Sequence, residues 1–251
     1  MNTQARWILS VGCILMAAVI AAAPAQAADV FAESFDGATF PPTGWTISNG
    51  IAGAVVWKLN TAVQEPNATG ATGKAVMVYS TGSPRTTYNT SLITPAISLP
   101  AASTNLKLVF RQVLETWSGD ETADVDISTD GGTTWTNLWR KKNIDREAGL
   151  VSISLSAYLN NSVKFRFRYY NTTAQAWDLW WQIDDVRVAT VLTGDITGDG
   201  KVNIFDLQRM ALSWNKLPGQ AGYDPACDLT GDGKVNIFDL QAMAQNWNKT
   251  A

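Results

Sequence analysis

One pattern of oxygen-bearing side chains occurs twice near the C-terminus of this 251-residue chain. Residues 195–215 read DITGDGKVNIFDLQRMALSWN and residues 228–248 read DLTGDGKVNIFDLQAMAQNWN, so 17 of 21 positions are identical. Each copy places a carboxylate, hydroxyl or amide oxygen at positions 1, 3, 5, 9 and 12. The side chains are Asp195, Thr197, Asp199, Asn203 and Asp206 in the first copy and Asp228, Thr230, Asp232, Asn236 and Asp239 in the second. Oxygen donors at this spacing favour a hard divalent cation, with calcium as the best match.

The spacing matches the twelve-residue calcium loop of an EF-hand. Position 7 of such a loop supplies a backbone carbonyl, here from Lys201 and Lys234, and position 9 acts directly or through a water molecule. Glycine at position 6, Gly200 and Gly233, permits the sharp turn. Position 12 is Asp rather than Glu, and no helix is predicted before either loop. A helix is predicted after each loop, because apolar residues recur at i, i+3, i+4 and i+7 over residues 207–214 and the matching segment. The sequence therefore predicts two calcium-binding units, each a loop followed by a helix.

This duplicated unit resembles the type I dockerin over roughly residues 194–249. The resemblance implies a calcium-dependent domain that docks onto a cohesin domain of an extracellular scaffold or surface protein. In dockerins, positions 10 and 11 of each loop face the cohesin. The resemblance therefore assigns partner binding to Ile204, Phe205, Ile237 and Phe238. Because the two pairs are identical, it also implies two alternative orientations on the partner. The family usually has Asn or Asp at position 3, so threonine there is a weaker ligand.

The chain upstream of this unit has a different pattern. Short apolar or alternating runs, at residues 106–110, 125–128, 163–169 and 180–188, are separated by clusters of Gly, Asn, Thr, Ser and Pro. Such runs predict an antiparallel jelly-roll β-sandwich over residues 28–192, followed by a small all-α domain over residues 193–251. The segment STDGGTTW at residues 128–135 matches the Asp-box motif and predicts a hairpin turn.

Four short segments resemble the choice-of-anchor J or cleaved adhesin family in their order and spacing. They are FAESFDG at residues 31–37, PTGWT at 42–46, LITPAISL at 92–99 and WQIDDV at 181–186. Members of this family are jelly rolls related in fold to the MAM domain. The resemblance implies adhesion or ligand binding outside the cell, with an extracellular glycan or protein as the ligand.

In such jelly rolls a calcium ion often bridges the first strand and the last. The matching residues here are Glu33 or Asp36 and Asp184 or Asp185. The alternative is that these acids cap turns or remain solvated, and adjacent Asp184 and Asp185 must point to opposite faces of a strand.

Tryptophan rings stack on sugar rings, so exposed ones would suit a glycan-binding surface. Most of the tryptophans upstream of residue 192 are expected in the core. Trp177, Trp180 and Trp181 cannot all face inward in one strand, so one of these three or Trp117 is the predicted surface residue.

The composition argues against several classes of enzyme. Without a histidine there is no Ser-His-Asp or Cys-His relay and no histidine-ligated zinc. A glycoside hydrolase needs two carboxylates, and Glu115 and Glu121, which flank a turn, are the only pair that could be argued for. We therefore expect a non-catalytic binding protein. The alternatives are a polysaccharide-degrading hydrolase and a purely structural component whose dockerin uses calcium only for stability.

The N-terminus predicts secretion. Arg6, an apolar run and the small-x-small signal at residues 25–27 read as a signal peptide over residues 1–27. No membrane span is expected after cleavage, and the one remaining cysteine, Cys227, is expected to be buried. The net charge of -3 offers no basic field for nucleic acid.

Overall fold

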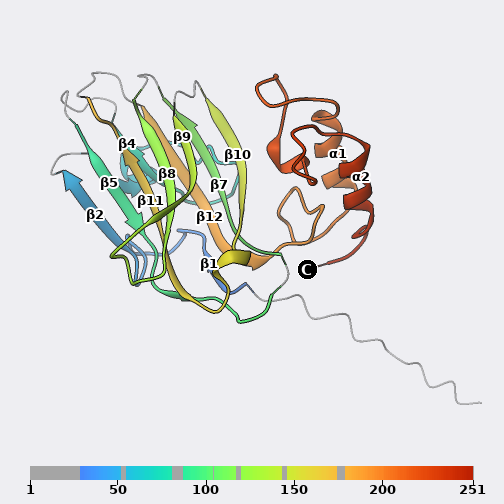
Figure 1. The fold of residues 1–251 in the computed structure, drawn as a ribbon. Helices are drawn as coiled ribbons and strands as arrows, with labels where there is room; N and C mark the ends of the chain where they lie inside the picture. The colour runs from blue at the N-terminus through green and yellow to red at the C-terminus, as the bar shows by residue number, and fades with distance from the viewer. Residues whose placement is uncertain are drawn as a thin grey trace, which may run out of the picture.

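The computed structural model of the protein describes residues 29–51, 55–80, 87–103, 105–116, 120–142, 146–173 and 179–250. The predicted signal peptide lies outside these ranges, as do Trp117 and Trp177. Within them, the chain forms a β-sandwich followed by a small helical unit (Figure 1). None of the helices in the described ranges is both long enough and apolar enough to cross a membrane.

The sandwich consists of two six-stranded antiparallel sheets, which confirms the predicted fold class. The first sheet has the order β10-β7-β12-β4-β3, with β1 also paired to β12, and the second has the order β2-β5-β11-β8-β9, with β6 also paired to β11. The strands of the first sheet are β1 (Phe31–Glu33), β3 (Trp57–Leu59), β4 (Val76–Tyr79), β7 (Leu106–Glu115), β10 (Glu147–Ser154) and β12 (Trp180–Thr190). The strands of the second sheet are β2 (Thr46–Ile51), β5 (Asn89–Ile93), β6 (Ile97–Ser98), β8 (Thr122–Ser128), β9 (Thr136–Lys142) and β11 (Ser162–Tyr170).

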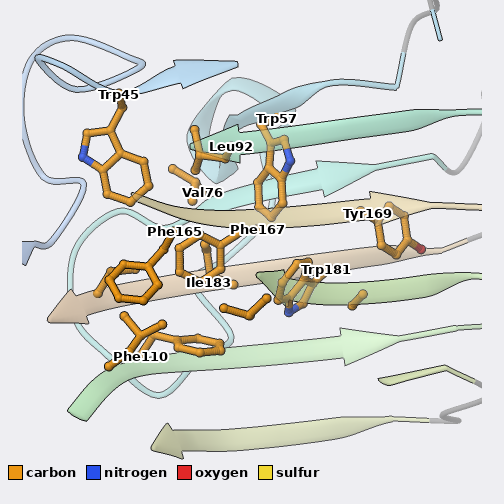
Figure 2. Close-up of a cluster of buried hydrophobic side chains, with 14 of the residues drawn as sticks. Trp45, Trp57, Val76, Leu92, Phe110, Phe165, Phe167, Tyr169, Trp181 and Ile183 are labelled. Atoms are coloured by element: carbon orange, nitrogen blue, oxygen red, sulfur yellow. The ribbon is translucent and has the colours of Figure 1, made fainter. Parts of the chain in front are cut away.

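Large aromatic side chains fill the space between the two sheets. Strand β11 alternates as the sequence predicts, with every second residue buried. Figure 2 shows Phe165 and Phe167 of this strand pointing toward Phe110 and Trp181 from the opposite sheet. The Phe110 and Phe167 rings meet edge to face with centroids 5.2 Å apart. This packed layer fixes the register of both sheets, because a slip by one residue would turn the aromatic face outward.

The outer face of the first sheet is also covered. In β7, Val109 and Val113 are buried although they point away from the core between the sheets. The segment that follows the short 3₁₀ helix η1 (Asn60–Val63) covers part of this face, since Ala68 donates its N–H to the side chain of Gln182, 2.7 Å away. The C-terminal unit covers another part.

The Asp-box segment forms the predicted turn between β8 and β9. The Asp130 carboxylate accepts hydrogen bonds from the backbone N–H groups of Thr133 and Thr134 at 2.9–3.0 Å. The hydroxyl of Thr134 donates to the same carboxylate, and this bond, together with the backbone bonds and one from the Ser128 hydroxyl, holds the pKa of Asp130 well below its usual range. Arg166 covers the Trp135 ring, with the guanidinium carbon 4.5 Å from the ring centroid. Both oxygens of Asp130 therefore accept hydrogen bonds within the turn, and the segment has a structural role.

The C-terminal unit is built from two similar halves. Its elements are α1 (Ile204–Leu212), the 3₁₀ turn η3 (Pro225–Cys227) and α2 (Ile237–Ala244), and another 3₁₀ turn, η2 (Ser156–Tyr158), lies in the sandwich. Backbone bonds cross between the halves: Asn248 donates to Val202 and Asn215 donates to Val235, both at 2.8 Å. A small core holds the halves together, and its fully buried members include Met210, Met243 and Cys227. Cys227 is a free, buried thiol, as expected.

Both helices are shorter than the periodicity predicts. The predicted apolar face runs to Trp214 and Trp247, but α1 ends at Leu212 and α2 at Ala244. The two tryptophans are more than a third exposed. The reason lies just beyond them: Asn215 and Asn248 adopt left-handed backbone angles and leave the helix to pair with the other half.

Candidate functional site

Each calcium-type loop brings three carboxylates together. Asp195, Asp199 and Asp206 each offer an oxygen, and these oxygens all lie within 4.8 Å of one another. The same holds for Asp228, Asp232 and Asp239. In both loops the glycine at position 6 has a φ of +81° or +82°, the left-handed conformation that the predicted sharp turn requires.

The carboxylate at position 12 organises each loop. Asp206 is completely buried and accepts the N–H groups of Ile196 and Thr197 on one oxygen and that of Asn203 on the other, at 2.8–2.9 Å. The hydroxyl of Thr197 donates to the same carboxylate at 2.9 Å. In the second loop Asp239 binds Thr230 and Asn236 in the same way. The threonine at position 3 therefore lies inside the acidic cluster in both loops.

The asparagine at position 9 starts each helix. The side-chain oxygen of Asn203 accepts the N–H of Phe205 at 2.8 Å, and Asp206 completes a capping box. Asn236 caps α2 identically through Phe238. Calcium-loop residues thus double as helix caps, which is why loop and helix form one unit.

The electrostatics of the loops favour a cation. Among the described residues, no salt bridge involves any of the six clustered carboxylates. Burial raises the pKa of Asp195, and the charges of Asp206 and Asp199 raise it further, against hydrogen bonds from Gly200 and Gly198. Three carboxylates held close together without a salt bridge fit calcium, because a bound Ca²⁺ would neutralise their mutual repulsion. The residues present therefore fit the metal that the sequence predicts.

The two predicted partner-binding pairs lie at equivalent and exposed places. Ile204 and Ile237 are each 50% exposed, and Phe205 and Phe238 are 61% and 59% exposed. All four occupy the first turn of their helices, next to a metal loop. Each half therefore presents the same apolar pair to solvent.

The four acids predicted for a calcium site in the sandwich are not gathered in one group. The two clusters of the helical unit are the only metal-sized groups of three acids among the described residues. Asp184 is buried and accepts from Asn67 at 2.7 Å, whereas Asp185 sits in a β-bulge and points toward Arg111, 3.7 Å away. Glu33 accepts the N–H of Phe35, and Asp36 accepts that of Lys74. Burial raises the pKa of Asp184 to about 7, with Asp185 and Asp36 adding smaller contributions.

The tryptophans predicted to form a glycan-binding surface differ in their burial. Trp181 is completely buried and stacks on Trp139 at 5.8 Å, so its prediction as a surface residue is wrong. It points inward because β12 alternates regularly there and Trp180 takes the outward position. Trp180 is partly exposed, and the guanidinium of Arg146 lies 5.5 Å from its ring centroid. Trp117 and Trp177 lie outside the described residues.

The carboxylates considered for glycoside hydrolysis are engaged in the fold. Glu121 is completely buried and accepts from the Tyr169 hydroxyl at 2.6 Å and from the Leu179 backbone. Glu115 forms an ion pair with Arg146 at 2.7 Å. A buried carboxylate bound in this way cannot reach a sugar, which disfavours the hydrolase alternative.

Sequence reasoning missed a cleft at the junction of the two units. A volume of about 1290 Å³ lies between the β9–β10 edge of the sandwich and residues 218–224 of the helical unit. Trp139, Arg146 and Gln112 line its sandwich side. The buried Oε1 of Gln112 has no hydrogen-bond partner. The sequence gives one signal that something covers this sheet. In β7 the outward-facing Val109 and Val113 are apolar like the inward-facing residues, which predicts a covered outer face.

These features define a two-module protein, a β-sandwich followed by a duplicated unit of acidic loop and helix. Residues 193–248 match the family described as the dockerin type I domain. The C-terminal module is therefore a type I dockerin domain. A comparison with curated protein sequences gave no match.

Solved structures similar to this chain include cleaved adhesin domains and carbohydrate-binding modules. The K1 cleaved adhesin domain of Lys-gingipain from Porphyromonas gingivalis W83 is 19% identical, with 64% of this chain and 97% of that one covered and a TM-score of 0.48. The K3 domain of the same protein is 18% identical over 64% and 99%, with a TM-score of 0.46. A family 11 carbohydrate-binding module from Clostridium thermocellum is 16% identical over 62% and 92%, with a TM-score of 0.39.

Proposed function

We propose that this protein is a secreted binding module that a dockerin attaches to a partner. In this proposal residues 1–27 are removed on secretion, residues 28–192 recognise an extracellular glycan or protein, and residues 193–251 bind a cohesin domain of a scaffold or surface protein. The observation that carries the proposal is the pairing, in each half of the dockerin, of a three-carboxylate loop with an exposed Ile-Phe pair.

Each dockerin loop would hold one calcium ion. The ligands would be the clustered carboxylates, the hydroxyl of Thr197 or Thr230 and the backbone carbonyl of Lys201 or Lys234. We assign the contact of Asn203 and Asn236 to a bridging water, because their side-chain oxygens already cap the helices. The bound ion would neutralise the cluster and so stabilise a small domain with a thin core.

The attachment is tested by capture of the mature protein on immobilised type I cohesin domains, with calcium and with EGTA. We expect capture only in calcium, and its loss in a variant with Asp195→Ala and Asp228→Ala. The matched control is Glu65→Ala, which removes an exposed acid of the sandwich that has no metal role. Capture that survives both EGTA and the double substitution would contradict the proposal.

Ligand recognition is tested by retention of the protein on insoluble and arrayed polysaccharides while the supernatant is assayed for released sugar. Retention without release is expected of a binding module. Release of sugar would contradict it, and release that is lost in Glu115→Gln would restore the hydrolase alternative.

The predicted calcium ion of the sandwich needs its own test, because no three of its four acids form a metal-sized group among the described residues. We place its ligands among Glu33, Asp36, Asp184 and Asp185. Calcium titration of a variant with Asp199→Ala and Asp232→Ala, which weakens both dockerin loops, would reveal a remaining site. The absence of that site would leave calcium binding to the dockerin alone.

A further inference from the structure

The two calcium loops have the same sequence at positions 3 to 9 but different surroundings. Thr230 and Gly231 of the second loop are exposed, whereas Thr197 and Gly198 of the first loop are half-buried. Since the residues are identical, the difference comes from what lies against the first loop. That neighbour is the outer face of the first sheet of the sandwich.

Two arginines of the sandwich bind the backbone of the first loop. Arg187 of β12 donates to the carbonyl of Gly198 at 2.6 Å, and Arg111 of β7 donates to the carbonyl of Thr197 at 3.2 Å. Leu150 of β10 packs on the same loop, where a Cβ added to Gly198 would lie 3.0 Å from its side chain. Gly231, the matching glycine of the second loop, has nothing within 4 Å of such a Cβ.

The arginines are positioned by their own neighbours. Arg111 lies 3.7 Å from Asp185, and Arg187 lies 3.9 Å from Asp29. Their targets are carbonyls at positions 3 and 4 of the loop. In the wrapped loop both carbonyls face the sandwich, and Gly198 has a φ of +77°. The sandwich therefore contacts the first loop in its wrapped conformation.

We propose that the first calcium loop is a docking element that fixes the dockerin on the outer face of its own β-sandwich, and that calcium in this loop controls the docking. The inference rests on the proposed binding of calcium by the dockerin. The second loop takes no part, so the two metal sites have different roles. Without calcium in the first loop its carbonyls no longer meet Arg111 and Arg187, and the dockerin moves away from the sandwich.

Docking leaves the partner surface free. The Ile-Phe pair beside the docked loop is as exposed as the pair beside the second loop. The docked chain would therefore present its partner-binding residues in a fixed orientation relative to the sandwich, and in a variable one after calcium is lost.

The test measures the distance between the two modules in the full mature chain. Cysteines placed at the exposed positions Ser48 and Gln245 are labelled in calcium with a donor and an acceptor dye, while Cys227 is buried. Energy transfer should report one narrow distance in calcium. The matched pair is Asp199→Ala against Asp232→Ala, which removes the position 5 carboxylate from the first or the second loop. Both are exposed.

We expect Asp199→Ala to broaden the distance distribution at a calcium concentration where Asp232→Ala keeps it narrow. Equal behaviour of the two variants would overturn the inference. Terbium luminescence on the same samples reports metal binding itself. If neither loop binds metal, the proposed function fails as well; if both bind and the distance never changes, only the docking inference fails.

A second variant avoids any change to the dockerin. Arg111→Gln with Arg187→Gln should keep terbium binding and raise the undocked population at least about tenfold, since each hydrogen bond from a charged donor is worth about that factor or more. Arg168→Gln is the control, because that arginine lies in β11 of the second sheet and donates to Asn89 within the sandwich. A double variant that stays docked would overturn the inference.

Discussion

The duplicated Ile-Phe pairs lead to a quantitative prediction for partner binding. If either half of the dockerin can engage the cohesin, the free protein has two equivalent ways to bind. Replacing Ile204 and Phe205 with alanine removes one way and leaves the other intact. Replacing Ile237 and Phe238 removes the second way. Either variant should therefore bind with about half the parent's association constant, a change of about 0.4 kcal/mol.

The equal exposure of the two pairs supports this factor of two. Phe205 and Phe238 differ by only two percentage points, at 61% and 59%, and the two isoleucines are identical at 50%. When all four residues are replaced, no apolar pair remains in either orientation. If both residues of a pair act as hot spots worth about 2 kcal/mol each, the affinity should fall about 800-fold.

Calorimetry with a cohesin domain in calcium measures these constants directly. Urea denaturation of each variant is the control for folding. A single-pair variant that loses all binding would refute the reasoning, because it would show that only that helix is used. Loss of binding in both single-pair variants would show that one complex needs both pairs at once.

Three further predictions concern stability and reactivity. Because burial raises the pKa of Asp184 from 3.8 to about 7, the folded chain retains a proton that the unfolded chain releases between these pH values. The free energy of unfolding in urea should therefore fall as the pH rises from about 4 to about 7. Asp184→Asn should flatten this slope, and an unchanged slope would contradict the prediction. Trp181→Ala should lower the free energy of unfolding by about 3–5 kcal/mol, and a loss below about 1 kcal/mol would contradict its place in the core. Burial raises the pKa of Cys227 to about 12, so iodoacetamide should modify it in EGTA but not in calcium, and equal rates would count against a calcium-stabilised core.

Local pattern was enough to predict the repeated loops and the strands β7, β8, β11 and β12. The oxygen spacing identified Asp195 and Asp228 as the first members of two acidic clusters, because loop geometry is set within twelve residues. Strand β11 was predictable because alternation with one buried face needs no knowledge of its neighbours. The ends of the helices could not be predicted in this way, because Asn215 lies beyond α1 and pairs with Val235 of the other half.

Residues whose role depends on distant elements escaped prediction. Trp180 and Trp181 are adjacent, and only the register of β12 against β7 decides which of them is buried. The carboxylate of Glu121 looked available in the sequence but lies beneath Tyr169, 48 residues away. Arg111 and Arg187 gave no signal of their own, because an isolated arginine in a strand normally faces solvent.

The two repeats differ at four positions, and the contacts at these positions show why they diverged. Arg209, which is Ala242 in the second copy, donates to the carbonyl of Ile196 at 2.7 Å and to Asp224 at 2.6 Å. Ser213 accepts the N–H of Asp224, whereas its counterpart Asn246 donates to Thr193 at the start of the dockerin. Thus at least two of these differences lie where each copy meets a different neighbour. The positions that would bind calcium or the partner are the same in both copies. What distinguishes the first loop is its place in the chain, a few residues after β12, where the two arginines contact its backbone carbonyls.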